Sequence, residues 1–333
     1  MAMTFRPTAS LLISKSNILI ARDAFSHKCV IGVTLVGCLD EPLWFLQGAK
    51  LERLRIEQRS AVNPDSIAMP LRSMHVRYLV YEGASPQGVR MDWVACVNRR
   101  LASVHRVIVR LYRVPLSMLP ANTKSLDVSR SVLSEPFLFG SYGADSVESV
   151  NFDEVHFERT FPDLSRFANL RELTVIQVGI ISRSPQPPIP LPDSLTYLEL
   201  GDRDEHFVNL QFTPLPEGLQ TLCLWSLRRW PFRSLPQGLK EVQIASARCH
   251  IPPSALPASL HTLTLKASAQ YKPGDPHPLA TYPVGLKVLK FECDDFPYPI
   301  GPLREGLETL VLPAKYSQRL GTLPARLKFL TVA

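Results

Sequence analysis

A ten-residue unit, Leu-Pro-x-x-Leu-x-x-Leu-x-Leu, recurs through the C-terminal part of the chain. Seven copies of it begin at Leu191, Leu215, Leu235, Leu256, Tyr282, Leu303 and Leu323. They are spaced 20 to 26 residues apart, a period typical of repeat proteins. Because a unit this short cannot bury its own leucines, successive units must stack and share a core. The repeat therefore predicts a solenoid.

The repeat continues toward the N-terminus in a degenerate form, in which Val, Ile or Phe often replaces Leu. The apolar core positions of these units are Leu170/Leu173/Val175, Val147/Val150/Phe152, Thr123/Leu126/Val128, Val104/Val107/Val109, Val76/Leu79/Tyr81, Leu51/Leu54/Ile56, Val30/Val33/Leu35 and Leu11/Ile13. About fifteen units then cover the chain. We expect one solenoid domain over residues 1–333, with degenerate repeats over 4–190 and regular repeats over 191–333.

This pattern resembles that of the leucine-rich repeat family, whose period is 20–29 residues. The short proline-containing unit is most similar to the FNIP-type repeats of amoebae and large viruses and to the LPxx repeats of bacterial effector proteins. The resemblance implies an α/β solenoid, wound as a right-handed superhelix, with a parallel concave β-sheet of about fifteen strands. Where the family usually places Asn after the strand, this chain has Arg203, Leu227, Ala247, Ser268, Asp294 and Lys315. We therefore expect other groups to satisfy the backbone there.

The alternation within each unit directs the leucines into the core and the x residues onto the concave face. Leu198, Leu222, Leu263 and Leu310 share one position in the unit and should form a buried ladder. The thirty prolines lack an N–H and fix φ, which favours an extended convex side. Two longer units leave room for a short helix, over residues 92–101 and 163–167.

The x positions of the strands define the candidate partner-binding surface. Its basic, acidic and aromatic members are Arg53, Arg55, Tyr78, Arg106, Arg110, Asp127, Asp153, Glu172, Tyr197, Glu199 and Trp225. Tyr, Trp and Arg are enriched among the residues that dominate the binding energy of protein interfaces. We therefore expect a non-enzymatic interaction or scaffold module that binds a protein partner through this face.

The sequence contains none of the common catalytic or cofactor-binding motifs. It has no glycine-rich phosphate or dinucleotide motif, no Gly-x-Ser-x-Gly and no His-Glu-x-x-His, and its eight histidines lack metal-ligand spacing. Cys293 precedes two aspartates, but it lies inside the repeat array, whereas effector ubiquitin ligases with similar repeats carry their catalytic Cys in a separate domain. Cys223 should face the concave side as a free thiol that nothing activates. We expect no enzymatic activity, cofactor or metal.

Charge is distributed unevenly along the chain. The net charge of +7 equals that of residues 1–110, while residues 127–205 carry a net charge of −8. Arg binds phosphate well, so the arginine-rich N-terminal part supports an alternative function as an RNA-associated or ribonucleoprotein subunit. The arginines are scattered around the coil, which favours the protein-binding interpretation.

Compartment and termini give two further expectations. The six cysteines form no CxxC pair, and the sequence has no Asn-x-Ser/Thr site and no apolar run of 18 residues, which indicates a cytoplasmic protein without membrane insertion. Residues 1–22 contain three bases and no acid, so a mitochondrial transit peptide is the alternative to a first repeat. At the other end, Leu327, Leu330 and Val332 should form an open edge that a partner or a second copy covers.

Overall fold

The structure is a computed structural model, and it describes 196 of the 333 residues. The described residues are 9–13, 30–36, 46, 49–57, 74–83, 101, 103–111, 120, 122–133, 144–181, 188–201, 212, 214–225, 232, 234–245, 255–266, 281–294 and 296–332. The chain divides into two compact units. Unit 1 comprises Met1–Leu170 with Gly179–Pro185, and unit 2 comprises Arg171–Val178 with Gln186–Ala333. One domain over 1–333 stays a prediction.

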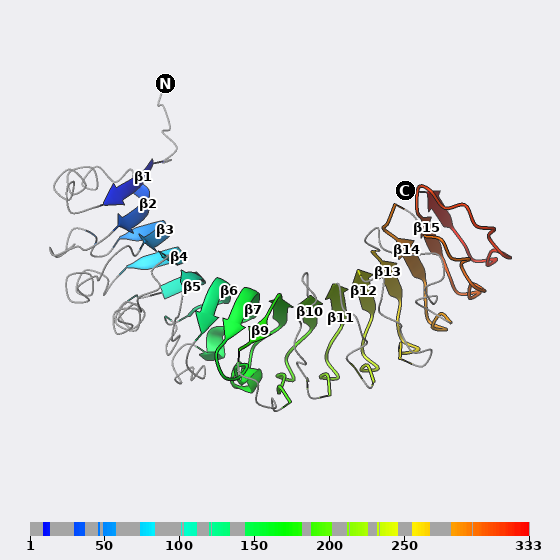
Figure 1. The fold of residues 1–333 in the computed structure, drawn as a ribbon, viewed down its shortest axis with the longest axis horizontal. Helices are drawn as coiled ribbons and strands as arrows, with labels where there is room; N and C mark the ends of the chain where they lie inside the picture. The colour runs from blue at the N-terminus through cyan, green and yellow to red at the C-terminus, as the bar shows by residue number, and fades with distance from the viewer. Residues whose placement is uncertain are drawn as a thin grey trace, which may run out of the picture. The chain divides into compact units, whose positions relative to one another are not determined.

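Unit 1 is a parallel sheet with one strand for each degenerate repeat. Its strands are β1 (Ala9–Ile13), β2 (Val30–Val36), β3 (Lys50–Glu57), β4 (His75–Gly83), β5 (Ser103–Leu111), β6 (Ser125–Leu133) and β7 (Ser149–Phe157), and the short β9 (Gly179–Ile180). From β1 to β7 each strand pairs with the next along the chain, and β9 pairs with β7 (Figure 1). Alternating Val and Ile, as in β5, suit strands with one buried face.

Unit 2 repeats the arrangement with the regular units. Its strands are β8 (Glu172–Ile176), β10 (Tyr197–Gly201), β11 (Thr221–Trp225), β12 (Glu241–Ala245), β13 (Thr262–Leu265), β14 (Val288–Phe291), β15 (Thr309–Leu312) and β16 (Phe329–Val332). All of them pair in parallel and in chain order (Figure 1). The prediction of one parallel strand per repeat is confirmed, with β9 as an extra bridge strand.

The leucine ladder forms the core of unit 2. Leu198 lies beside Leu222, and Leu263 follows after one intervening strand, each in register with its neighbour. Leu310 continues the row through Leu289, and all of these side chains are fully buried. The predicted ladder is therefore confirmed. Since residues two apart along a strand face the same side, the register also directs every x residue outward.

Each Leu-Pro segment forms a turn that leads into the next strand. In Pro-x-x-Leu the leucine N–H donates to the proline carbonyl, at 3.0 Å for Leu219 and Pro216 and at 3.1 Å for Leu195 and Pro192. The expected extended conformation is therefore wrong for the two residues after the proline. Proline suits this position because the turn uses its carbonyl oxygen and does not need the N–H that proline lacks.

The described residues contain two short 3-10 helices, η3 (Ala144–Ser146) and η4 (Leu164–Arg166), and no α-helix. η4 lies within the helix predicted over 163–167, and Asp163 caps it by accepting the Ser165 N–H at 3.0 Å. The helix predicted over 92–101 lies outside the described residues, apart from the buried Leu101. The α/β class and the right-handed winding stay predictions.

A ladder of backbone hydrogen bonds joins successive coils at the start of the strands. The carbonyl of the residue before each strand accepts two N–H groups from the next coil, at 2.8 to 3.1 Å. The accepting residues in unit 2 are Arg171, Thr196, Gln220, Lys240, His261, Lys287 and Glu308. These positions share no side-chain type, because the backbone itself makes the bonds.

Candidate functional site

The predicted surface residues gather on the solvent side of each sheet, which we call the sheet face. In unit 1, Arg53, Tyr78 and Arg106 form one row across β3, β4 and β5. In unit 2, Glu172 lies beside Tyr197. Glu199 and Trp225 lie on β10 and β11. The structure therefore brings the predicted residues together within each unit.

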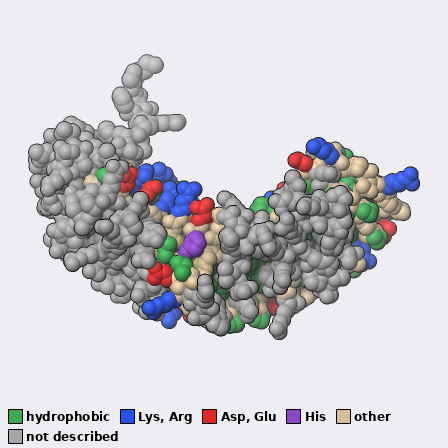
Figure 2. Space-filling model, viewed as in Figure 1, with side chains coloured by type: hydrophobic (Ala, Val, Ile, Leu, Met, Phe, Trp, Pro, Cys, Tyr) green, Lys and Arg blue, Asp and Glu red, His purple; other side chains and the backbone are tan. Residues whose placement is uncertain are grey.

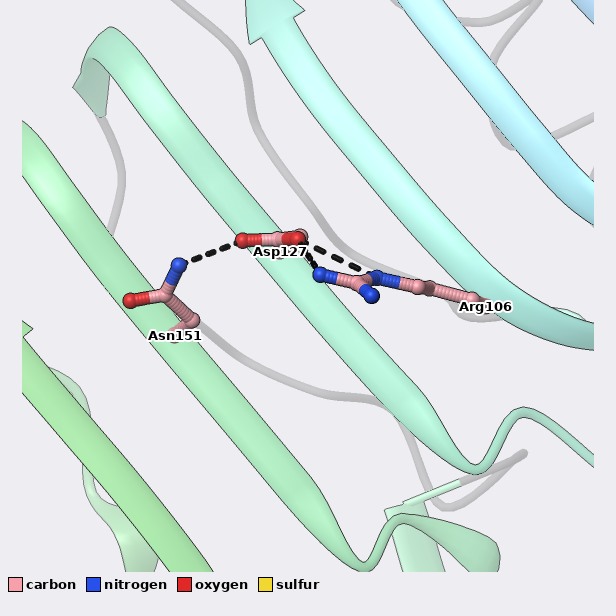
Figure 3. Close-up of polar contacts among 3 residues, drawn as sticks. All are labelled: Arg106, Asp127 and Asn151. Carbon is pink, nitrogen blue, oxygen red and sulfur yellow. Dashed lines mark hydrogen bonds and ion pairs between the residues drawn. The ribbon is translucent and has the colours of Figure 1, made fainter.

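A hydrogen-bonded network crosses three strands on the sheet face of unit 1 (Figure 3). Asp127 on β6 accepts from Arg106 on β5, through both Nε at 3.1 Å and Nη2, and it accepts from Asn151 Nδ2 on β7 at 2.6 Å. The Asp127 side chain is largely buried between them. Each of its oxygens has a donor, so the carboxylate holds the guanidinium and the amide in fixed positions.

The basic patch predicted for unit 1 is interleaved with acids. Arg55 pairs with Glu82 at 2.6 Å and with Glu57 at 3.0 Å. Arg53 and Arg110 are exposed and make no ion pair with the described residues. Figure 2 shows Lys and Arg side chains gathered among Asp and Glu side chains on this part of the molecule. The sheet face of unit 1 is therefore mixed in charge.

Three further residues of this site, Glu57, Glu82 and Asn151, occupy outward positions of the units, and the sequence analysis did not predict their pairing. Asn151 and Asp127 are 24 residues apart, and Arg106 and Asp127 are 21 apart. The two residues of each pair lie on neighbouring strands, and their separation along the sequence equals one repeat. Aligning the units and comparing outward residues on neighbouring strands is the signal that finds them.

In unit 2 the site includes a hydrogen-bonded cluster around Glu199. The Tyr197 hydroxyl donates to Glu199 Oε2 at 2.9 Å, and Thr174 Oγ1 donates to the same oxygen at 3.4 Å. Cys223 lies beside Glu199 in the register and is 2% exposed. Burial, with the Glu199 and Glu241 carboxylates, raises the pKa of the Cys223 thiol to about 11, although the Tyr197 hydrogen bond opposes this. The thiol therefore stays protonated near neutral pH and is a poor nucleophile.

Trp225 at the end of β11 is the aromatic anchor of the same face. It lies beside Gly201, where an added Cβ would approach Trp225 Cβ to 3.1 Å and crowd the indole side chain. Lys266 Nζ lies 5.3 Å from the centre of the indole, a cation–π distance, and pairs with Glu292 at 3.4 Å. The indole Nε1 is buried and has no hydrogen-bond partner.

The remaining predicted residues lie apart from these clusters. Asp153 on β7 pairs in register with Ser129. At the C-terminal strand, Leu327 is half-buried, while Leu330 and Val332 are 47% and 62% exposed. β16 pairs with β15 alone among the described strands. That this edge is an interface stays a prediction.

The described residues contain no group of three or more His, Cys, Asp or Glu side chains that could hold a metal ion. Within the same ranges, no helix is long and apolar enough to cross a membrane.

Comparisons with known proteins find similarity among solved structures. No protein-family model matches the chain, and no curated protein matches it. Among solved structures, the chain is similar to "The crystal structure of CroV588 a novel circular LRR protein structure", with 13% identity and a TM-score of 0.27. The match covers 91% of this chain and 66% of that one. The fold assignment rests on the strand pairing and the leucine ladder, which make the chain a parallel β-solenoid with leucine-rich-repeat-like units.

Proposed function

We propose that this protein is a non-enzymatic interaction module that binds a protein partner through the sheet face. The Arg106–Asp127–Asn151 network carries the proposal. Its side chains are already held by one another and by three paired strands, so little side-chain entropy is lost when a partner binds. A fixed guanidinium and a fixed amide offer directed hydrogen-bond donors to that partner.

Trp225 supports the same function in unit 2. Tryptophan is the side chain most enriched among binding hot spots, and this one is held in place beside Gly201 and Lys266. Its unpartnered Nε1–H is a donor that a small rearrangement would offer to a carbonyl of the partner. Cys223, the buried thiol on this face, has its pKa raised to about 11, which argues against thiol catalysis here.

The test compares surface variants in quantitative affinity capture, followed by binding measurements with each purified partner. Arg106→Ala and Trp225→Ala should each lower the affinity for a specific partner by about tenfold or more. This corresponds to a loss of at least about 1.4 kcal/mol of binding free energy. Glu217→Ala is the matched control, because Glu217 is exposed in a Leu-Pro turn away from the strands. Partners that are lost with Glu217→Ala but kept by both sheet-face variants would overturn the proposal.

Association with RNA is the second candidate function, and one observation favours it. Arg53 and Arg110 are exposed and unpaired among the described residues, so they are available to phosphate. Arg55 and Arg106 already pair with carboxylates, which weakens the electrostatic attraction. Charge reversal of Arg53 and Arg110 should reduce RNA affinity and its salt dependence if this function is real, and unchanged affinity excludes it.

A further inference from the structure

A groove of about 760 Å³ runs along the N-terminal ends of β3 to β6 in unit 1. We call it the edge groove. Its floor includes Leu51, Val76 and Val104, which are buried core positions of three successive coils. The groove does not include the Arg106–Asp127–Asn151 network, and its volume lies within the range of ligand-binding sites.

The walls of the edge groove are rich in donors. They carry Lys50, Arg77 and Lys124 against one carboxylate, Glu52, and two imidazoles, His75 and His105. Lys50 and His105 are exposed and make no ion pair with the described residues. The groove therefore offers positive charge and N–H donors above an apolar floor, a combination that suits an oxyanion attached to an apolar or neutral chain.

The two internal ion pairs of the groove leave its bases available. Arg77 pairs with Glu52 at 3.1 Å, and Lys124 pairs with Glu148. The four side chains are 44% to 61% exposed, and exposed pairs of this kind stabilise a protein very little. An incoming anion can therefore share or replace these carboxylates without a large loss of stability.

His75 is oriented by its neighbouring strand. Its Nδ1 lies 2.7 Å from the Ser103 hydroxyl oxygen, and both residues line the groove. When the Ser103 hydroxyl donates to Nδ1, the ring carries its proton on Nε2 and can donate it to an anion. The groove thus contains a positioned imidazole donor as well as the ammonium groups of Lys50 and Lys124.

We propose that the edge groove binds an extended acidic peptide segment of a protein partner. The inference rests on the proposed function, since it supplies the chemistry of one partner segment. From β3 to β6 the groove spans about 14 Å, because parallel strands lie about 4.8 Å apart. An extended peptide covers that length with four or five residues at about 3.3 Å each.

A peptide suits the groove better than a nucleic acid strand does. Glu52 in the wall, and Glu148 where it pairs with Lys124, repel a continuous row of phosphates but leave places for separate carboxylates. Among the described residues that line the groove, Tyr78 is the only Phe, Tyr or Trp, so successive bases have few large rings on which to stack.

The experiment measures binding of fluorescein-labelled hexaglutamate to the full chain by fluorescence anisotropy. Hexaglutamine is the uncharged comparison, and a ten-nucleotide uridine RNA tests the nucleic-acid outcome. Lys50→Glu with Lys124→Glu is the groove variant, and Lys287→Glu with Lys315→Glu is the control. The control changes the net charge equally, and Lys287 holds the same coil position as Lys124 but in unit 2. Lys50→Gln with Lys124→Gln repeats the test with less risk to folding.

We expect hexaglutamate to bind the natural protein at least about tenfold more tightly than hexaglutamine. The groove variants should lose about tenfold in affinity, while the control loses less than about threefold. Equal losses in both variants would show attraction by net charge alone and would overturn the proposal. So would the absence of hexaglutamate binding at about 1 mM peptide. Tighter binding of the RNA, lost in the groove variant, would assign the groove to nucleic acid instead.

The result is separable from the test of the sheet face. Arg106→Ala and Trp225→Ala lie outside the groove and should bind hexaglutamate as the natural protein does. If hexaglutamate fails to bind while those variants still lose their partner, the groove proposal falls and the sheet-face function stands. If hexaglutamate binds as expected while those variants keep every partner, the sheet-face proposal is wrong and the edge-groove proposal is supported.

Discussion

Leu222 lies in the middle of the leucine ladder, between Leu198 and Val242 on the neighbouring strands, and is fully buried. Replacing it with alanine removes buried methyl groups and leaves a cavity that paired strands on both sides cannot close. Leu222→Ala should therefore lower the free energy of unfolding by about 2–5 kcal/mol. Urea unfolding followed by circular dichroism measures it. Thr221→Ala, on the outward side of the same strand, should cost less than about 1 kcal/mol; equal losses would mean that the facing of β11 is wrong.

Cys223 gives a second prediction at the scale of one residue. Its pKa of about 11, raised by burial, means that almost no thiolate forms at about pH 8. The folded state therefore holds the thiol proton of Cys223 more tightly than the unfolded state does. The resulting contribution to folding stability is fully present below the pKa of the unfolded thiol, and it is lost as the pH rises from there through about 11. In the folded protein Cys223 should react with iodoacetamide far more slowly than the half-buried Cys293, as peptide mapping would show. Equal labelling before and after urea unfolding would contradict this environment.

At the scale of the element, the glycine of the Leu-Pro-x-Gly-Leu turn sets how closely coils stack. A Cβ at Gly238 would lie 2.5 Å from the Glu217 carbonyl oxygen, and one at Gly285 would lie 2.2 Å from that of Ala258. Both carbonyl oxygens are backbone atoms of the preceding coil, so neither can move away from an added Cβ without disturbing its own turn.

Gly238→Ala and Gly285→Ala should each destabilise unit 2 by about 1–3 kcal/mol, the usual cost of overpacking. Gly301→Ala is the matched control, because a Cβ there meets nothing within 4 Å. Thermal unfolding of the three variants provides the measurement. If Gly301→Ala proves as costly as the other two, the coil contact is not the reason for glycine in the turn.

Backbone hydrogen bonds join the coils of unit 2 at positions with no common side-chain type. Arg171, Gln220 and His261 hold equivalent positions, and the carbonyl of each accepts two N–H groups of the next coil. Because only backbone atoms take part, the side chains at these positions are free to vary and to carry surface charge. In unit 1 the Lys124 carbonyl accepts the Glu148 and Ser149 N–H groups in the same way.

At the scale of the whole molecule, every paired strand from β1 to β6 and from β10 to β16 contacts its neighbours along the chain. The stability of such an array is close to a sum of coil and nearest-neighbour terms. Leu222→Ala should therefore raise amide hydrogen exchange most in β10, β11 and β12, less in β15, and not in β4. Mass spectrometry of deuterated peptides resolves these strands. A uniform increase over both units would show all-or-none unfolding instead.

The repeat predicts the order and the facing of every strand except the short β9, which has no repeat unit of its own. A leucine such as Leu263 recurs at one position of every unit, and period two within the unit decides which side chains are buried. The tertiary structure alone decided the ion pairs and the edge groove. Arg106 meets Asp127 because strand pairing places Arg106 opposite Ser125, two residues before Asp127, so that the guanidinium reaches diagonally to the carboxylate. The role of glycine in the Leu-Pro turns also depends on the tertiary structure, because the stacking of coils places that glycine against a carbonyl of the preceding coil.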